Sequence, residues 1–233
     1  MERFEEFLNE RKYLLERVPQ DFSLLQLRFP VTHLAYLKEE QKILATLGTA
    51  EIKRLLECRP AVGARKSTNL VRAHLVALTI LDTGLRISEA LGLSKEDMDF
   101  DNLVIKVIGK GGKHRLVPFS MELRKSVFRY ASGKQAGDFI FGTKNQTEVS
   151  VRNFERDFKV LGQKCGITGI RFSPHTLRHT FAVSYLRNGG NLEYLRRILG
   201  HSSLSTTQKY LKSLGVEDLG AVHNSLSPLS ARR

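Results

Sequence analysis

The sequence predicts an α+β protein that is mostly α-helical and carries one small, three-stranded antiparallel sheet. Apolar residues recur at helical spacing over most of the chain, and the period changes to two between residues 102 and 119. Strands do not alternate with helices, as they would in a doubly wound fold. At 233 residues the chain is long enough for one large domain, or for one domain and an appendage.

Four helices are expected ahead of the sheet. Apolar spacing predicts a helix over 2–17, and Thr49 stands where the N-cap of a second helix would be. The strongly apolar run 69–83 predicts a buried helix that Gly84 ends. Ser88 is expected to cap the helix that follows.

The sheet is expected to form around a hairpin. Apolar residues alternate over 103–108, a glycine-rich turn follows at 109–113, and a second strand begins at Arg115. Residues 138–141 (DFIF) predict the third strand. From residue 150 onward the pattern is helical again, with breaks at glycines.

The positive charge is concentrated in one part of the chain. Residues 1–60 carry ten Lys or Arg and ten Asp or Glu, so the excess of +13 lies entirely in the remainder. Such an excess is typical of a protein that binds a polyanion, usually nucleic acid. Basic proteins that bind anionic membranes share this composition.

Other features bear on location and metals. No apolar run approaches the roughly 18 residues of a membrane helix, and the N-terminus is too charged for a secretory signal, so a cytoplasmic protein is expected. Cys58 and Cys165 lie far apart, and neither has a Cys or His at metal-ligand spacing. This pattern indicates reduced thiols and no metal site.

Residues 173–182 (SPHTLRHTFA) hold the first candidate site. Ser173 and Pro174 are a strong helix start, so His175 and Arg178, three residues apart, share a face at its N-terminal end. Free N–H groups and the helix dipole make that end suitable for a phosphate. Taken alone, the pair is equally well explained as a helix-start histidine and a surface arginine. His175 and His179 lack the glutamate of the zinc motif.

Two further cations stand at chain reversals. Arg86 lies in a tight corner between two helices, where a guanidinium offers bidentate donors to a phosphate. Lys110 lies in the hairpin turn, from which it could reach a DNA groove; the turn lacks the Walker A pattern. The alternatives are an arginine that satisfies helix carbonyls and a solvated, lysine-rich turn.

The stretch 199–210 (LGHSSLSTTQKY) holds the last candidates. Gly200 is expected to end a helix, and His201 begins the connection. Capping-box spacing over 205–208 predicts a new helix with Tyr210 in its second turn, on a different side from the expected core anchors Leu211 and Leu214. A tyrosine at the edge of the core is the alternative interpretation of Tyr210.

Together these motifs resemble the tyrosine site-specific recombinases, the phage-integrase and Xer-like family. The resemblance covers about residues 45–215 and rests on T-G-L-R-x-S-E around Arg86, G-K-G-x-K around Lys110, H-x-L-R-H at 175–179, and L-G-H followed nine residues later by Tyr210. It implies the tyrosine-recombinase catalytic-domain fold.

The resemblance also implies a division of the chain. Residues 1–45 would be a short N-terminal helical segment and linker, either a naturally short form of the family's core-binding domain or a truncated one. Residues 46–214 would be the catalytic domain. Residues 215–233 would be a tail of the kind that family members pass to a neighbouring protomer.

The resemblance implies a catalytic set. Tyr210 would attack a DNA phosphodiester and form a 3′-phosphotyrosyl link, while Arg86 and Arg178 hold the non-bridging oxygens. Lys110 would be the general acid and His175 the general base. His201 would donate a hydrogen bond to the phosphate, and Lys113 and Arg115 would contact the DNA. His179 matches a family position, but its place in the helix indicates a structural role.

The implied partners are a double-stranded DNA recombination site and further copies of the chain, as a tetramer on synapsed DNA. No metal, nucleotide or other cofactor is expected, and the protein would be associated with the nucleoid. Two alternatives remain open: a type IB topoisomerase-like nicking-closing enzyme, and a catalytically silent DNA-binding regulator.

Overall fold

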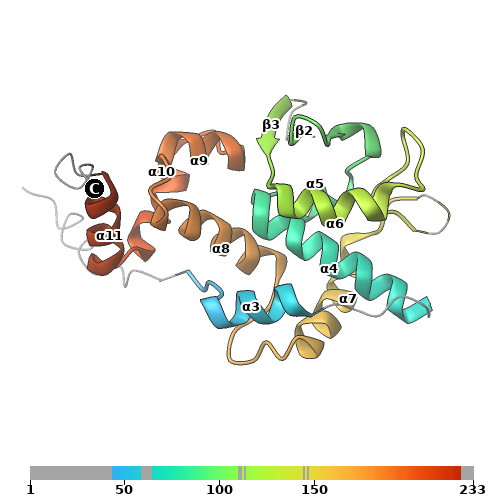
Figure 1. The fold of residues 1–233 in the computed structure, drawn as a ribbon, viewed down its shortest axis with the longest axis horizontal. Coiled ribbons are helices and arrows are strands. Elements are labelled where there is room, and N and C mark those ends of the chain that lie inside the picture. Colours follow the sequence, from blue (N-terminus) through green and yellow to red (C-terminus); the bar gives the residue numbers. More distant parts are fainter. Residues whose placement is uncertain are drawn as a thin grey trace, which may run out of the picture. The chain divides into compact units, whose positions relative to one another are not determined.

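The computed structural model describes residues 44–58, 65–109, 112, 114–143, 145 and 147–226. This part of the chain is mostly helical, with a three-stranded antiparallel sheet on one side (Figure 1), as the sequence predicts. The helix expected over 2–17, Lys110 and Lys113 lie outside the described residues. Within the described residues, no helix combines the length and apolar character needed to cross a membrane.

The core forms around helix α4 (Arg65–Thr83), which begins four residues earlier than predicted. Helices α7 (Val151–Lys164) and α8 (Pro174–Arg187) pack against α4, and α6 (Met121–Ala131) also contacts it. Ala73, Val76 and Ile80 of α4 are fully buried. The apolar run 69–83, predicted to form a buried helix, therefore contributes to the larger apolar core of the protein, and Figure 1 shows α4 beside α6 and α7.

Two helix starts differ from the predictions because a glutamate does the capping. Helix α3 (Thr49–Glu57) has Gly48, rather than Thr49, as its N-cap residue. Helix α5 (Ile87–Leu91) has Arg86, rather than Ser88, in that position. In each case the carboxylate at the third helical position accepts the backbone N–H of the N-cap residue, which satisfies it without a Ser or Thr side chain.

Two strands of the sheet are those predicted and the third is not. Strands β2 (Val104–Ile108) and β3 (His114–Pro118) form the hairpin, with Val107 opposite Arg115. The third strand is β1 (Met98–Asp99), which follows the 3₁₀ helix η3 (Lys95–Asp97) and pairs with β2.

The prediction of a strand over 138–141 is wrong, since this segment forms only an isolated bridge between Ser94 and Phe139. Ile140 and Phe141 are fully buried. Their apolar character therefore reflects packing in the core. A short apolar run in the sequence does not distinguish a buried strand from another buried segment.

The C-terminal part begins with α9 (Leu192–Leu199), which ends at Gly200 with φ +65°, as predicted. Helix α10 (Leu204–Gln208) is capped by Ser203, two residues before the predicted cap. Tyr210 therefore follows α10 and precedes the 3₁₀ helix η4 (Leu211–Ser213), rather than lying in a second turn.

This shift reverses the predicted burial of neighbouring residues. Tyr210 is 1% exposed and packs in a second apolar cluster with residues of α8 and α9, whereas Leu211 is 42% exposed. The prediction of Leu211 as a core anchor is wrong.

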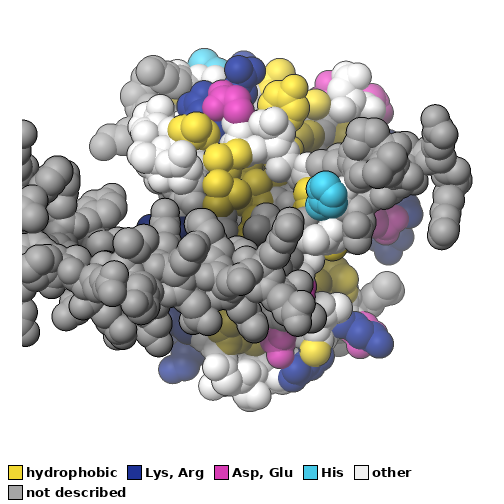
Figure 2. All heavy atoms as spheres, turned by 90° about the vertical axis from the view of Figure 1, so that its left-hand side faces the viewer, with side chains coloured by type: hydrophobic (Ala, Val, Ile, Leu, Met, Phe, Trp, Pro, Cys, Tyr) yellow, Lys and Arg dark blue, Asp and Glu magenta, His cyan; other side chains and the backbone are white. Residues whose placement is uncertain are grey.

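The last described helix, α11 (Val216–Leu226), contacts α8, with an ion pair of 3.1 Å between Arg187 Nε and Asp218 Oδ2. Hydrophobic side chains reach the surface among basic and acidic ones on the face in Figure 2.

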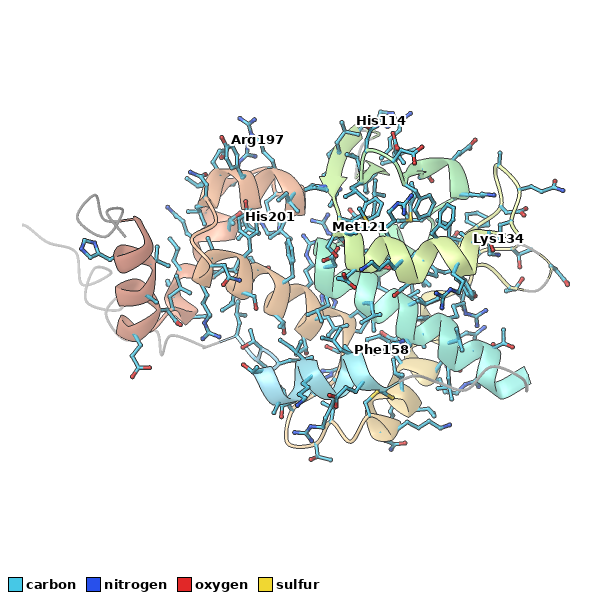
Figure 3. The ribbon with its side chains drawn as sticks, viewed as in Figure 1. His114, Met121, Lys134, Phe158, Arg197 and His201 are labelled. Carbon is cyan, nitrogen blue, oxygen red and sulfur yellow. The ribbon has the colours of Figure 1, made fainter. Side chains whose placement is uncertain are left out.

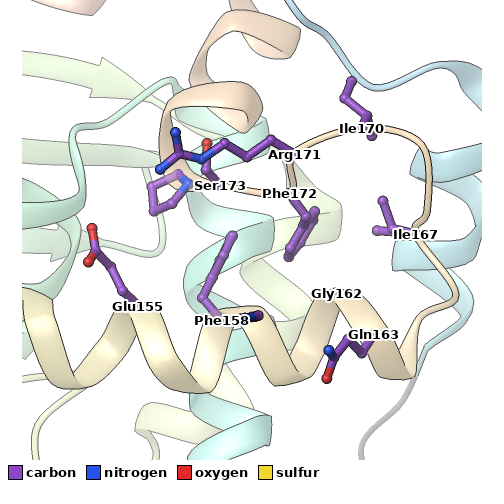
Figure 4. A pocket seen from close by; sticks show the side chains of 11 residues that line it. Glu155, Phe158, Gly162, Gln163, Ile167, Ile170, Arg171, Phe172 and Ser173 are labelled. Atoms are coloured by element: carbon purple, nitrogen blue, oxygen red, sulfur yellow. The ribbon is translucent and has the colours of Figure 1, made fainter.

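A groove of about 460 Å³ lies between α7 and the segment that leads into α8 (Figure 4). Phe158 and Phe172 stack there with ring centroids 4.5 Å apart. A Cβ at Gly162 would lie 2.8 Å from Cδ1 of Phe172, so a glycine is needed for this close packing. None of the predicted site residues that the structure describes lines the groove.

Candidate active site

Arg178 joins three segments that are distant in the sequence. Its guanidinium, 6% exposed, donates to the carbonyl of Gly84, to the carbonyl of Leu199 at 2.8 Å, and to Nε2 of His201 at 3.2 Å. Burial, and then the charge of Arg86, lower the pKa of Arg178 to about 10, so this side chain stays positive at neutral pH. No carboxylate of the described part of the chain forms an ion pair with Arg178, so this buried cation is well placed for an anion.

Gly84 shapes the corner that leads to Arg86. It has φ +66°, and a Cβ there would lie 2.4 Å from Cδ1 of Phe181. Only glycine therefore fits this corner without strain or displacement. Two residues later Arg86 is well exposed, and its Nη1 lies 3.0 Å from Oε1 of Glu89.

Glu89 is a buried carboxylate between two arginines. Its oxygens accept from Arg115 Nη1 and Nη2 at 3.0 and 2.8 Å, and from the Arg86 backbone N–H at 2.8 Å. Burial alone would raise the pKa of Glu89, but the hydrogen bonds from Arg115 and from Arg86 outweigh it and lower that pKa. Glu89 is therefore ionised, and it orients both arginines.

Arg115, predicted as a DNA contact, is bound inside the protein. Besides Glu89, it donates from Nε to the carbonyl of Ile198 at 2.9 Å, and its side chain is 13% exposed. These three hydrogen bonds favour a structural role over the predicted one.

The contacts of His201 define its tautomer. Arg178 can only donate, so Nε2 of His201 is the acceptor and the ring proton lies on Nδ1, which faces the Thr207 hydroxyl at 2.9 Å. Burial, and then the charge of Arg178, lower the pKa of His201 to about 4. Figure 3 shows His201 between α9 and α8, whereas Arg197 projects outward from α9.

The Tyr210 ring is enclosed by this set. It lies parallel to the His201 ring at 6.4 Å between centroids, and Lys209 Nζ lies 5.1 Å from its centroid. Burial raises the pKa of the Tyr210 phenol, and the charge of Arg178 opposes that rise. The tyrosine is therefore protonated and held inside the protein in this state.

The histidine at the Tyr210 hydroxyl is His179, not His175. Nδ1 of His179 lies 3.4 Å from the phenolic oxygen, whereas His175 is exposed on the first turn of α8. Burial, and then Lys209, lower the pKa of His179 to about 4, so it is neutral and can accept a proton. Sequence reasoning expected a structural role for His179 and named His175 as the base, whereas the contact with the phenol in this structure belongs to His179.

The structure thus brings together Arg86, Arg178, His201 and Tyr210 around the α4–α5 corner and the end of α9. His175 lies on the same end of α8 as Arg178. Glu89 and Arg115 connect this group, and sequence reasoning missed the role of Glu89. Among the described residues, no group of three or more His, Cys, Asp or Glu side chains is arranged to hold a metal ion.

Comparison with known proteins identifies a family and several similar proteins. A family model described as the phage integrase family matches residues 45–215. A tyrosine recombinase of Pseudothermotoga lettingae is 34% identical over 84% of this chain and 66% of its own length. The tyrosine recombinase XerC of Syntrophus aciditrophicus is 36% identical over 68% of this chain and 54% of its own.

Solved structures agree in fold. The XerA recombinase crystal structure aligns with a TM-score of 0.65 and 28% identity over 97% of this chain and 82% of that one. The chain spans about half to two thirds of the length of the curated relatives above.

Proposed function

The chain belongs to the phage integrase family, and we propose that it cuts and rejoins DNA at specific sites through a covalent bond to Tyr210. The observation that carries this proposal is the convergence of two arginines, His201 and Tyr210 on one corner of a basic domain. In the reaction, the Tyr210 oxygen bonds to phosphorus while the bond from phosphorus to the 5′-oxygen breaks. The products are a 3′-phosphotyrosyl strand and a 5′-hydroxyl strand.

Arg86 and Arg178 hold the two non-bridging oxygens of the phosphate. Arg178 is buried and positive, and Arg86 is exposed at the mouth of the same corner. Because both are oriented before DNA arrives, they stabilise the extra charge of the transition state with little reorganisation. Each such donor contributes about 3–4 kcal/mol in comparable sites.

Proton transfers complete the cleavage. His175 accepts the tyrosine proton, Lys110 donates a proton to the departing 5′-oxygen, and His201 hydrogen-bonds the phosphate. The ester keeps the energy of the broken bond, so a 5′-hydroxyl of a partner strand can attack it and restore a phosphodiester. No metal, nucleotide or other cofactor enters this scheme.

Tyr210 leaves its cluster before it attacks. A ring that is 1% exposed cannot reach a bound duplex, so DNA binding is coupled to a movement of the segment after α10. The partners we propose are a double-stranded recombination site and further copies of the chain, assembled as a tetramer in the cytoplasm at the nucleoid. The tail 215–233 would join neighbouring protomers, and its described helix α11 would then leave its contact with α8.

Covalent trapping tests the proposal. Sites that bind the Tyr210→Phe protein are selected from a randomised duplex pool and remade with a nick beside the scissile phosphate. The wild type should form a covalent protein–DNA adduct and Tyr210→Phe none. Tyr194→Phe is the matched control, because Tyr194 is 60% exposed on α9 and should leave the adduct unchanged.

Two results would overturn the proposal. One is an adduct with Tyr210→Phe equal to that of the wild type. The other is no adduct with the wild type on a selected site to which footprinting shows tight binding, which would favour the silent regulator.

A further inference from the structure

Arg115 occupies an inward position of its strand. On β3 the side chains alternate, with Val117 fully buried and His114 and Leu116 exposed, so Arg115 lies on the same face as Val117. Its partner across the ladder, Val107, is also buried. A guanidinium on the inward face of a strand needs polar partners, because leaving it unpaired is costly.

Those partners belong to the candidate site. The Glu89 carboxylate accepts both Nη atoms of Arg115 and, with the same two oxygens, the backbone N–H and Nη1 of Arg86. Nε of Arg115 donates to the carbonyl of Ile198, in the last turn of α9 and three residues before His201. One guanidinium therefore connects the hairpin, the Arg86 corner and the end of α9.

The backbone next to His201 is shaped around this guanidinium. A Cβ at Gly200 would lie 3.0 Å from Cζ and Nη1 of Arg115, so the planar group packs directly against the glycine. Gly200 also needs its φ of +65° to end α9. The position thus requires glycine for two separate reasons, one of which is Arg115.

We propose that Arg115 is a positioning residue for DNA cleavage, which acts through Glu89 to orient Arg86 and through the end of α9 to orient His201. The inference rests on the proposed function. It replaces the predicted DNA contact of Arg115, since all three guanidinium nitrogens donate within the protein and the side chain is only 13% exposed. Lys cannot substitute fully, because an ammonium does not make the two parallel hydrogen bonds of a guanidinium.

A double-mutant cycle tests the proposal. The probe is a selected duplex with sulfur in place of the 5′-bridging oxygen, whose good leaving group keeps slow variants measurable. Cleavage at saturating protein, the Kd for the duplex and the melting temperature are measured for Arg115→Gln, Arg86→Lys and the double variant. Arg72→Gln is the matched control, because Arg72 is equally buried and pairs with Asp157 and the Gly142 carbonyl away from the site.

The expected result is specific to positioning. Arg115→Gln should slow cleavage by about 10- to 100-fold with an unchanged Kd, because a small misplacement of a catalytic group has an effect of that size. In the Arg86→Lys background, the same change should cost clearly less than in the wild type, because the route through Glu89 is already impaired and only the route through the end of α9 to His201 remains to be lost. Arg72→Gln should lower the melting temperature and change the cleavage rate by the same small factor in both backgrounds.

Three results would overturn the proposal. The first is a loss of cleavage rate in the double variant equal to the product of the two single losses, and the second is a loss confined to the Kd. The third is a melting temperature so low that neither Arg115→Gln nor Arg115→Lys folds. The last would make Arg115 a residue of the fold alone. If the wild type forms no adduct at all, the proposed function fails instead, so the two failures are distinguishable.

Discussion

Nη2 of Arg178 lies 3.2 Å from Nε2 of His201, and this contact makes the histidine an acceptor in the DNA-free protein. The proposed hydrogen bond from His201 to a phosphate therefore requires a proton on Nε2 that is absent in this state. A phosphodiester anion beside the ring would favour the protonated form. DNA binding and proton uptake by His201 are thus linked.

The first prediction concerns pH. His201 and His179 have pKa values of about 4, below the ordinary 6.5, so between these values the unfolded chain binds protons that the folded chain does not. Stability should be highest above pH 6.5 and fall as the pH is lowered toward 4. Melting curves over this range measure the trend, and NMR titration of the two imidazoles assigns it. A His201 pKa near 6.5 would contradict the burial of this ring beside Arg178.

A second prediction separates the two arginines. Arg86→Ala should change the free energy of unfolding by less than about 1 kcal/mol, because Arg86 is exposed and the Glu89 carboxylate keeps its two hydrogen bonds from Arg115. Arg178→Ala should destabilise by roughly 2–4 kcal/mol, because it leaves the carbonyls of Gly84 and Leu199 buried without a donor. Both should slow cleavage at least about 100-fold. Urea unfolding and single-turnover cleavage measure the two quantities; equal stability losses would argue against this division.

The glycine corner supplies a third prediction. Gly84→Ala should destabilise by about 3 kcal/mol or more, because it combines a positive φ with a Cβ 2.4 Å from the Phe181 ring. Gly137→Ala is the control, since Gly137 also has a positive φ but nothing within 4 Å of a Cβ. That variant should cost only about 1–2 kcal/mol of backbone strain. Similar losses for both variants would show that the close packing at Gly84 is unimportant.

The fourth prediction concerns the proton acceptor for Tyr210. His175→Gln should slow cleavage by about 100-fold or more at an unchanged melting temperature, because His175 is exposed and is the proposed base. His179→Gln should have the smaller effect on the rate, because its contact with the phenol belongs to the buried state of Tyr210. If the two effects are reversed, His179 is the base, and its contact at 3.4 Å is the catalytic one.

Local sequence patterns were sufficient for much of the fold. The hairpin, the buried helix α4, the Ser173-Pro174 helix start and the glycine at the end of α9 all follow from rules that act within a few residues. The errors came where tertiary contacts decided between similar local choices. Ile140 and Phe141 are buried without pairing as a strand, and β1 rather than this segment pairs with β2.

The order and spacing of residue types along the chain are enough to identify the family and to name the candidate site residues. Which of those residues meet depends on the tertiary structure. Long-range hydrogen bonds, such as those from Arg178 to Gly84 and from Arg115 to Glu89, join positions 94 and 26 residues apart. No local pattern encodes such a pairing, because it depends on how helices and strands pack. For the same reason, the burial of Tyr210 and the internal role of Arg115 became visible only in the folded chain.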